Sequence, residues 1–458
     1  MSFKITTFRD CDISQIMIIL HLEIFSQFAV MNKRLSVLCI ITLMLTIVAH
    51  SQQSPDTLSQ IAPSRLTIGG YGEAVYSHHF YSDNVFRYTF ANRYADSRGH
   101  SQVDLPHVVF MLGYDFGHGW TLGTELEFEH GGTESAVEME SEETGEYEKE
   151  IERGGEVALE QFWLQKSFNP ALNLRLGHDV VPVGATNNAH LPSQFFGVFR
   201  PEGEATILPS TWHATGLSLW GKLGHCRYQA MLIPSLNSSL FSVANWAGGA
   251  SASPYEFTPA NRLGLAARLD NYSVKGLRVG LSGFLGNTFN NDIVTDEFSN
   301  KYSNVKALMM FASLDFLYQQ GPLTARGNLD YGHLNEAAKV SAYNSTLSNS
   351  SQSPYPHTLV GQEAFDAALE LGWNWLKPSA LKSLVTFLRY DYYDSYIPVQ
   401  GLADYQWTDR HCFSLGLNYK PVNEIIIKAE AGIRHLRQQY NDEPWFALGI
   451  AYTGFFNK

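Results

Sequence analysis

The chain has 458 residues, of which 17% are charged and 13% aromatic, and its formal net charge is −13. An acidic chain without a basic cluster is a poor partner for nucleic acid, and a mean hydropathy of −0.15 is too polar for a bundle of membrane helices. Many aromatic and few charged side chains are typical of a membrane barrel, whose interior and loops are wet although its outer band is apolar.

The first 51 residues are expected to be a targeting region. Lys33 and Arg34 precede an apolar stretch over residues 35–49, and Ala49-His50-Ser51 has the small-x-small pattern that a signal peptidase cuts. The apolar stretch is too short for a helix that spans a bilayer. The predicted division of the chain is a targeting region over 1–51 with a true start at Met31 and a signal peptide over 31–51, a linker over 52–65 and a barrel over 66–458.

After the linker the chain repeats one pattern: two segments of alternating residues joined by a short turn and followed by a long polar connection. The clearest unit is HVVFMLGYDFGHGWTLGTELEFEH, residues 107–130. Its second half places Glu125, Glu127 and Glu129 on one face and large apolar residues on the other. Three carboxylates on alternate residues must face water. The apolar face is therefore the one that is expected to meet lipid.

Sixteen segments follow this pattern, an even number, as a closed barrel with both chain ends on one side requires. The expected strands are 66–77, 105–116, 120–130, 158–168, 172–181, 215–223, 226–234, 261–270, 277–286, 305–318, 322–333, 362–375, 382–395, 410–420, 425–436 and 445–456. Connections after every second strand are short and most others are long, as periplasmic turns and extracellular loops are. The predicted fold is all-β, a transmembrane antiparallel up-and-down β-barrel of about 16 strands, within about 14–18.

The last predicted strand, residues 445–456, must close the barrel against the first. A terminal aromatic strand is similar to the signal by which the outer-membrane assembly machinery recognises its clients, although Asn457 and Lys458 follow Phe456 here. The expected partners are this machinery and the lipid and lipopolysaccharide of the outer membrane. A homotrimer is left open, and both chain ends are expected in the periplasm.

The alternation also nominates side chains that line the pore. The acidic ones are Glu125, Glu127, Glu129, Asp366 and Glu370, and the basic ones are Arg175, Arg262, Arg268, Arg278, Arg326, Lys428 and Arg434. In a ring of sixteen strands the third stands opposite the eleventh, so an acidic wall could face a basic wall and order the water between them. The alternative is a solvated inner face with local salt bridges.

The long connection over residues 182–212 is rich in proline and aromatic residues. Loops this apolar seldom extend into water. One hypothesis is that the connection folds into the mouth and narrows the pore, with Arg200, Glu202 and Glu204 as constriction candidates and Arg200 at the narrowest point. The alternatives are an outer cap and a subunit contact.

Features that could suggest metal binding or catalysis are weak. Ten Glu lie between Glu134 and Glu156, but the run lacks the Asp-x-Asp spacing of a calcium site, and such runs are usually solvated, mobile loops. His78 and His79 are adjacent, so on a strand they point to opposite faces. Nothing brings Ser218 to a histidine in a catalytic arrangement. We therefore predict no metal, no cofactor and no enzymatic activity.

Four stretches carry a family resemblance. They are GGYGEAVYS from Gly69, PVGATNNAHLPSQFFGVFRPEGEATILPSTW from Pro182, FLRYDYYD from Phe387 and GLNYKPVNEIIIKAEAG from Gly416. Each resembles Gram-negative outer-membrane porins of the phosphate-selective O/P-like kind. The resemblance implies a porin-like diffusion channel in the outer membrane of a Gram-negative bacterium. No ladder of arginines or cluster of loop lysines is recognisable in the sequence to support selectivity for phosphate.

The function expected from the sequence is therefore that of a porin, a water-filled channel for passive diffusion of small polar or ionic solutes. Two alternatives remain open. One is a surface β protein that binds glycan or a host ligand without a channel, which would have an apolar core and dissolve without detergent. The other is a purely structural outer-membrane barrel.

Overall fold

A computed structural model describes residues 65–82, 84–96, 98–130, 135–141, 147–153, 157–253, 257–291, 302, 304–347, 355–376, 382–437 and 439–456. The predicted signal peptide and nearly all of the predicted linker lie outside these residues. Within the described ranges, no helix combines the length and the apolar character needed to cross a bilayer.

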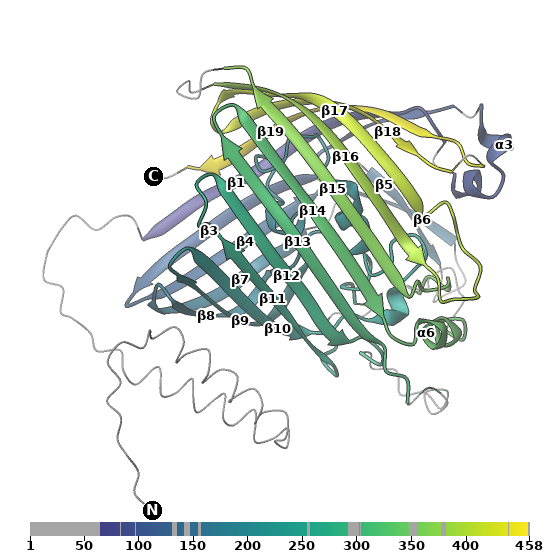
Figure 1. Cartoon of the computed structure of the whole chain (residues 1–458), viewed down its shortest axis with the longest axis horizontal. Helices are drawn as coiled ribbons and strands as arrows, with labels where there is room; N and C mark the ends of the chain where they lie inside the picture. The colour runs from purple at the N-terminus through teal and green to yellow at the C-terminus, as the bar shows by residue number, and fades with distance from the viewer. Residues whose placement is uncertain are drawn as a thin grey trace, which may run out of the picture. The chain divides into compact units, whose positions relative to one another are not determined.

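The strands form one closed antiparallel barrel (Figure 1). They are β1 (Leu66–His79), β2 (His100–Asp104), β3 (His107–Gly117), β4 (Trp120–Glu129), β7 (Val157–Asn169), β8 (Leu172–Val180), β9 (His213–Leu223), β10 (Cys226–Pro234), β11 (Leu263–Asn271), β12 (Leu277–Asn287), β13 (Leu308–Gln320), β14 (Leu323–Leu334), β15 (Glu363–Asn374), β16 (Ser383–Ile397), β17 (Asp409–Val422), β18 (Ile425–His435) and β19 (Glu443–Phe455). β19 pairs with β1 from Phe455 opposite Gly69 to Trp445 opposite His79 and closes the ring.

β2 and β3 together make one barrel strand. Both pair with β1, β2 along its second half and β3 along its first. The interruption falls at Leu105 and Pro106, and proline has no N–H to give to a strand ladder. The seventeen strand segments of the sheet therefore form sixteen barrel strands, and the predicted fold class is confirmed.

Short turns and long connections alternate around the barrel. The turn between β9 and β10 consists of residues 224–225, and Gly224 adopts the left-handed backbone, with φ 56°, that so tight a turn needs. Long connections leave from the opposite end and include α3 (Ala91–Tyr94) and α6 (Ala337–Asn344), both far from the C-terminus in Figure 1. We call the two ends the short-turn rim and the long-loop rim. β1 begins and β19 ends at the short-turn rim.

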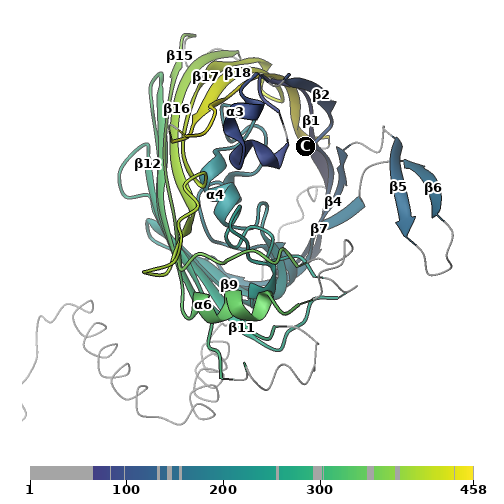
Figure 2. The same ribbon diagram turned by 90° about the vertical axis from the view of Figure 1, so that its right-hand side faces the viewer.

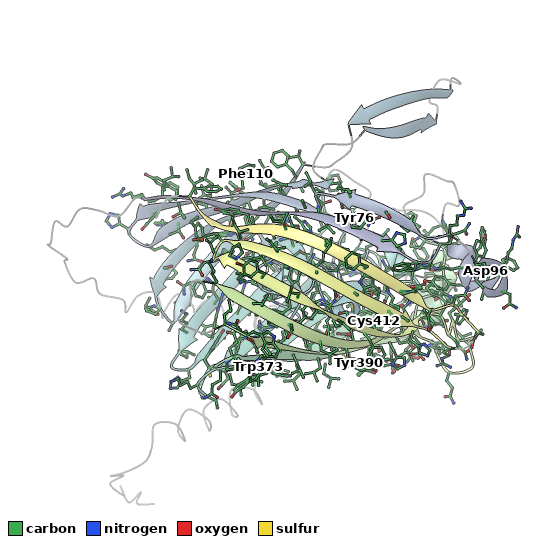
Figure 3. All side chains as sticks on the ribbon, turned by 90° about the horizontal axis from the view of Figure 1, so that it is seen from above. Tyr76, Asp96, Phe110, Trp373, Tyr390 and Cys412 are labelled. Atoms are coloured by element: carbon green, nitrogen blue, oxygen red, sulfur yellow. The ribbon has the colours of Figure 1, made fainter. Side chains whose placement is uncertain are left out.

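The outer face of the barrel is an apolar belt. Phe110 is 52% exposed, Leu281 57% and Leu415 61%, and Figure 3 shows Phe110 and Trp373 projecting from opposite sides of the barrel. A soluble sheet would bury side chains of this size, whereas on a closed barrel they face lipid and leave no backbone group unpaired. The barrel is therefore transmembrane.

The apolar core lies inside the barrel. It joins Ile207 and Trp212 from the connection between β8 and β9 to Phe241 and Trp246 from the connection between β10 and β11. Inward side chains of the wall complete it, among them Met231, Ile233, Phe284, Met309 and Leu334. The long connections thus fold inward, pack on one another and fill part of the lumen.

The acidic run between Glu134 and Glu156 was expected to be a mobile loop, and that expectation is wrong for its described part. β5 (Ser135–Ser141) and β6 (Tyr147–Arg153) pair with each other in a separate two-stranded sheet. The sequences SAVEMES and YEKEIER alternate acidic with other residues, and this alternation favours a strand.

Candidate functional site: the lumen and its inner segment

The connection between β8 and β9 crosses the lumen, and we call its residues 182–212 the inner segment. It contains η3 (Asn187–Ala189) and α4 (Glu202–Ile207). Figure 2, which looks into the barrel, shows α4 within the ring of strands. Of the three constriction candidates, Glu202 and Glu204 belong to α4, and Arg200 lies two residues before it.

Side chains of the barrel wall hold the inner segment by its backbone. Lys428 Nζ on β18 lies 2.8 Å from the carbonyl oxygen of Gly197, and Arg389 Nη1 on β16 lies 3.1 Å from that of Phe199. Arg326 on β14 donates to a third carbonyl of the segment. Lys428 and Arg326 were nominated as pore-lining residues, and in the structure both are hydrogen-bonded to the inner segment.

Arg389, Glu430 and residues 197–199 form a unit that we call the clamp. The backbone N–H groups of Val198 and Phe199 donate to Glu430 Oε2 over 2.8 and 3.2 Å, and Arg389 forms an ion pair with the other carboxylate oxygen. A Cβ atom on Gly197 would lie 2.6 Å from Glu430 Oε2 and 2.8 Å from Arg389 Nη1. Only glycine lets the chain approach the ion pair this closely.

Glu202 binds the arginines on the long-loop side of α4. Its carboxylate lies 2.7 Å from Arg434 Nε and 3.9 Å from Arg410 Nη1, and it accepts a hydrogen bond of 2.7 Å from the hydroxyl of Tyr393. Burial alone would raise the pKa of Glu202, but the two guanidinium groups lower it to about 2. Glu202 is therefore ionised, and Arg434, nominated as pore-lining, is its partner.

Glu204 links the two ends of the inner segment by hydrogen bonds. Its carboxylate accepts the N–H groups of Ala185 and Asn187 over 2.6 and 2.8 Å. Burial and the nearby carboxylate of Asp330 raise the pKa of Glu204 to about 8. Arg200 also bonds within the segment, because its Nη1 donates to Thr211 Oγ1 over 3.0 Å.

Three buried carboxylates lie on adjacent strands beneath α4, and we call Asp330, Asp366 and Asp391 the carboxylate cluster. Asp391 Oδ2 accepts the N–H groups of Glu202 and Gly203 over 2.6 and 2.9 Å. Asp330 and Asp366 are directly opposite each other on β14 and β15. Each of the three has an Oδ1 atom without a hydrogen-bond partner among the described residues. Like charges in such positions repel each other.

The opposite wall carries a second polar group. His107 on β3 pairs with Glu127 on β4, and Tyr71 on β1 donates to Glu160 on β7 over 3.0 Å. His213 Nε2 lies 3.9 Å from Glu160 Oε1. Although histidines and carboxylates gather here, no group of three or more His, Cys, Asp or Glu in the described ranges could hold a metal ion.

The other nominated charges form mostly local ion pairs, within one strand or between strands that lie close together in the barrel. Arg268 Nη2 lies 2.8 Å from Asp270 Oδ1 and 2.9 Å from Asp315 Oδ2, and Arg278 Nη1 lies 2.8 Å from the same Asp270 oxygen. The remaining pairs are Arg175 with Asp179, at 2.7 Å, and Arg326 with Glu370, at 2.9 Å. The charges thus follow the second alternative, local salt bridges, rather than two opposed walls.

We assign no ion pair to three of the nominated residues, Arg262, Glu125 and Glu129. Arg262 was expected on a strand, but β11 begins at Leu263, and Arg262 is exposed with its Nε 3.4 Å from the carbonyl oxygen of Phe289. The expected strand started two residues early because Asn261 and Arg262 continue its alternation. Glu125 is half-buried on β4, and Glu129 is the last residue of that strand.

A cavity of about 790 Å³ separates the inner segment from the wall on the short-turn side, and we call it the basic cavity. Seven basic residues line it: Arg227, Arg268, Lys275, Arg278, Arg326, Arg389 and Lys420. Its acidic lining residues are Asp270 and Glu370. Arg227, Lys275 and Lys420 have no acidic partner in the part of the chain that the structure describes. The sequence analysis missed this cavity because its residues come from separate strands and turns.

A second cavity, of about 430 Å³, lies on the long-loop side, and we call it the long-loop cavity. Its charged lining residues are Arg200, Glu202, Arg389, Asp391 and Arg434, and Cys412 and Trp445 also line it. Pro201 and Arg389 are the residues that line both cavities.

Comparison with known proteins agrees with this architecture. No protein family matches the chain. Among solved structures, Salmonella typhi OmpF in complex with daunomycin is 10% identical with a TM-score of 0.50, over 85% of this chain and 97% of that chain. The fold is that of an outer-membrane porin. An anion-selective porin from Comamonas acidovorans is also 10% identical, with a TM-score of 0.49 over 85% of this chain and 99% of that one.

A protein of known sequence is similar to this chain over most of its length. It is an uncharacterized protein of Aquifex aeolicus (strain VF5), 24% identical over 390 residues that make up 82% of this chain and 77% of that protein. The resemblance to O/P-like porins noted in the sequence stays a prediction, because no family matched.

Proposed function

We propose that the protein is an outer-membrane channel through which small polar solutes diffuse passively, with a preference for anions. The observation that carries this proposal is the basic cavity, whose lining has seven basic and two acidic residues. A confined surface of one charge raises the local concentration of the opposite ion and lowers that of ions with the same charge.

The resemblance to phosphate-selective O/P-like porins fits this preference. Guanidinium and ammonium groups bind phosphate and carboxylate oxygens through charge-assisted hydrogen bonds. Arg227, Lys275 and Lys420 are the candidates for such binding, because the other basic lining residues bond to carboxylates or to the inner segment. We propose selectivity for anions as a class, with phosphate as one member.

The proposed setting follows from the same architecture. The short-turn rim, with both described chain ends, would face the periplasm, and the long-loop rim would face outward. β19 would be recognised by the barrel-assembly machinery, and the belt would contact outer-membrane lipid and lipopolysaccharide. We propose no enzymatic activity, and a homotrimer remains open.

The test is a single-channel recording of the full chain, purified from the outer membrane of a Gram-negative host, in a planar bilayer under a KCl gradient. We expect discrete, stable current steps and a reversal potential whose sign shows that chloride permeates more readily than potassium. A folded barrel without steps would favour a structural barrel, and binding of a glycan without steps would favour a surface receptor. A reversal potential whose sign shows that potassium permeates more readily than chloride would refute the role given to the basic cavity.

A further inference from the structure

We propose that the long-loop cavity binds an uncharged, hydroxyl-bearing molecule of the size of a monosaccharide, through Trp445 and Ser414. This inference goes beyond the proposed function, because the ligand carries no charge and its site is not the basic cavity. Neither Trp445 nor Ser414 was nominated from the sequence.

The wall side of the long-loop cavity is built on one row of residues that crosses four strands. Ser414 on β17 lies between Arg389 on β16 and Gly432 on β18. Gly432 is in turn directly opposite Trp445 on β19. Arg389, Ser414 and Trp445 line the cavity, and so do residues of the inner segment between Phe199 and Ser210. The cavity therefore lies between the barrel wall and the inner segment.

Gly432 allows the indole ring of Trp445 to lie against the wall. A Cβ atom on Gly432 would lie 2.2 Å from Trp445 Cζ2 and 2.7 Å from Cε2, so a larger residue would displace the ring. Cε2 is the carbon that carries Nε1. The N–H edge of the indole thus lies over Gly432, whose other neighbour in the row is Ser414.

Both side chains have a polar atom that the protein does not satisfy. Trp445 Nε1 and Ser414 Oγ have no hydrogen-bond partner among the described residues, although Trp445 is only 7% and Ser414 only 4% exposed. Buried polar atoms are nearly always hydrogen-bonded, and those that lack a protein partner bond to water or to a ligand. Because both residues line the long-loop cavity, their hydrogen bonds go to whatever occupies it.

Trp163 shows how an indole in the same setting is normally satisfied. It lies against Gly123 of the neighbouring strand, and a Cβ atom on this glycine would also lie 2.2 Å from Cζ2 of the ring. Trp163 Nε1, however, donates to Gln161 Oε1 over 3.2 Å. In the described part of the chain, Trp445 has no such partner, and its N–H is left for a ligand.

The charged side chains of the long-loop cavity already have partners within the protein. The contacts are those of Arg434 with Glu202, Arg389 with Glu430, Asp391 with two N–H groups of α4, and Arg200 with Thr211. The groups left for a ligand are an indole N–H and a hydroxyl, which carry no charge. They match an oxygen that accepts one hydrogen bond and donates another, as the hydroxyl of a sugar or polyol does.

The size of the cavity also fits a small molecule. Its volume is about 430 Å³, within the range of pockets that bind small ligands. An indole combines a large apolar surface with one polar atom, so it can contact the C–H groups of a sugar ring while Nε1 bonds to a hydroxyl.

The test is isothermal titration calorimetry of the full-length protein in detergent with glucose, gluconate and glucosamine, which have similar carbon skeletons and differ in charge. We expect glucose to bind with a dissociation constant in the millimolar range, as a small ligand with few hydrogen bonds does. Gluconate and glucosamine should bind more weakly, because an added charge finds no free partner in the cavity.

Two variants assign the binding to this site. Trp445→Phe keeps an aromatic ring but removes the N–H, and Ser414→Ala removes the hydroxyl. Each should weaken glucose binding about threefold to tenfold, the effect of one lost hydrogen bond. Trp163→Phe is the matched control and should bind glucose as the wild type does. Ser414→Ala tests the same site if Trp445→Phe fails to fold.

Three results would overturn the inference: no binding of glucose, tighter binding of gluconate than of glucose, and glucose affinity that is unchanged in both cavity variants. Any of them in a protein that conducts with a preference for chloride would leave the proposed function intact. Glucose binding that depends on Trp445 and Ser414, in a barrel that does not conduct, would instead support the site and overturn the channel.

Discussion

The two cavities of the lumen differ in charge although one segment of chain separates them. The basic cavity has seven basic and two acidic lining residues, whereas the long-loop cavity has three arginines against two carboxylates. The charges of the second cavity are largely engaged in holding α4, as Glu202 and Asp391 show. In the first, three cations have no acidic partner among the described residues.

This difference separates two tasks that charged side chains perform in the lumen. Buried ion pairs and hydrogen bonds to backbone on the long-loop side fix the inner segment in one position, and breaking one leaves an uncompensated charge. In the proposed channel, the unpaired cations on the short-turn side would be the ones that act on ions. Contacts on both sides thus hold the inner segment, and the unpaired cations occur on the short-turn side.

Removal of the barrier between the cavities should have the largest effect. Deletion of residues 195–204 would merge the two spaces and expose Arg389 and Glu430 to water, and we expect conductance to rise at least about twofold. Deletion of residues 135–153, the separate β5–β6 hairpin, is the control and should leave conductance unchanged. An unchanged conductance in the first variant would show that the inner segment does not limit the current.

Neutralisation of the unpaired cations should abolish the charge contrast between the cavities. We expect the triple variant Arg227→Gln, Lys275→Gln and Lys420→Gln to lower the chloride-to-potassium permeability ratio about threefold to tenfold, with little change in conductance. The effect should shrink at high salt, because mobile ions screen exposed charges. Lys382→Gln, an exposed lysine outside both cavities, is the control, and an equal change in it would point to surface charge instead.

A smaller effect is expected where α4 meets the carboxylate cluster. Ala at position 203 would place its Cβ atom on Asp366 Oδ1, so Gly203→Ala should displace α4 and lower the free energy of unfolding by about 1–3 kcal/mol. The measurement is thermal unfolding in detergent. Gly249→Ala, where the nearest atom to a new Cβ lies 3.8 Å away, is the control. Equal melting temperatures for the two variants would contradict the close packing at Gly203.

The smallest effect is a pH dependence of the inner segment. We call the inner segment docked when it is packed inside the barrel as in the structure. Glu204 has a pKa of about 8 in this docked state, against an ordinary value of 4.5. The docked state therefore binds the proton of Glu204 more tightly than a state in which the segment has left its place. Docking therefore weakens as the pH rises above about 4.5, and the proton-linked part of its stability is lost above about 8. We expect more frequent conductance fluctuations at pH 9 than at pH 6, by roughly twofold.

Two variants test the assignment of this pH dependence. Glu204→Gln keeps an acceptor oxygen but cannot titrate, so its fluctuations should be the same at both pH values. Glu336→Gln, at the long-loop rim, should behave as wild type does. A pH dependence that survives in Glu204→Gln would assign it to another group, such as the carboxylate cluster.

Much of the barrel follows from local patterns in the sequence. Alternation assigned sixteen strands, and the parity of turn lengths placed the connections at the correct rims, because the period of a strand and the length of a turn depend on neighbouring residues only. The errors were local as well: Pro106 breaks one strand into β2 and β3, and an acidic run taken for a loop forms the β5–β6 hairpin.

The sequence by itself determined the fold class, the inward direction of residues such as Glu127 and Arg268, and the unusual character of residues 182–212. The tertiary structure decided which partners those residues have. Val198 and Glu430 meet in the clamp although 232 residues separate them, and no local pattern encodes such a contact. The basic cavity and the carboxylate cluster arise in the same way, because barrel closure and loop packing bring distant strands together.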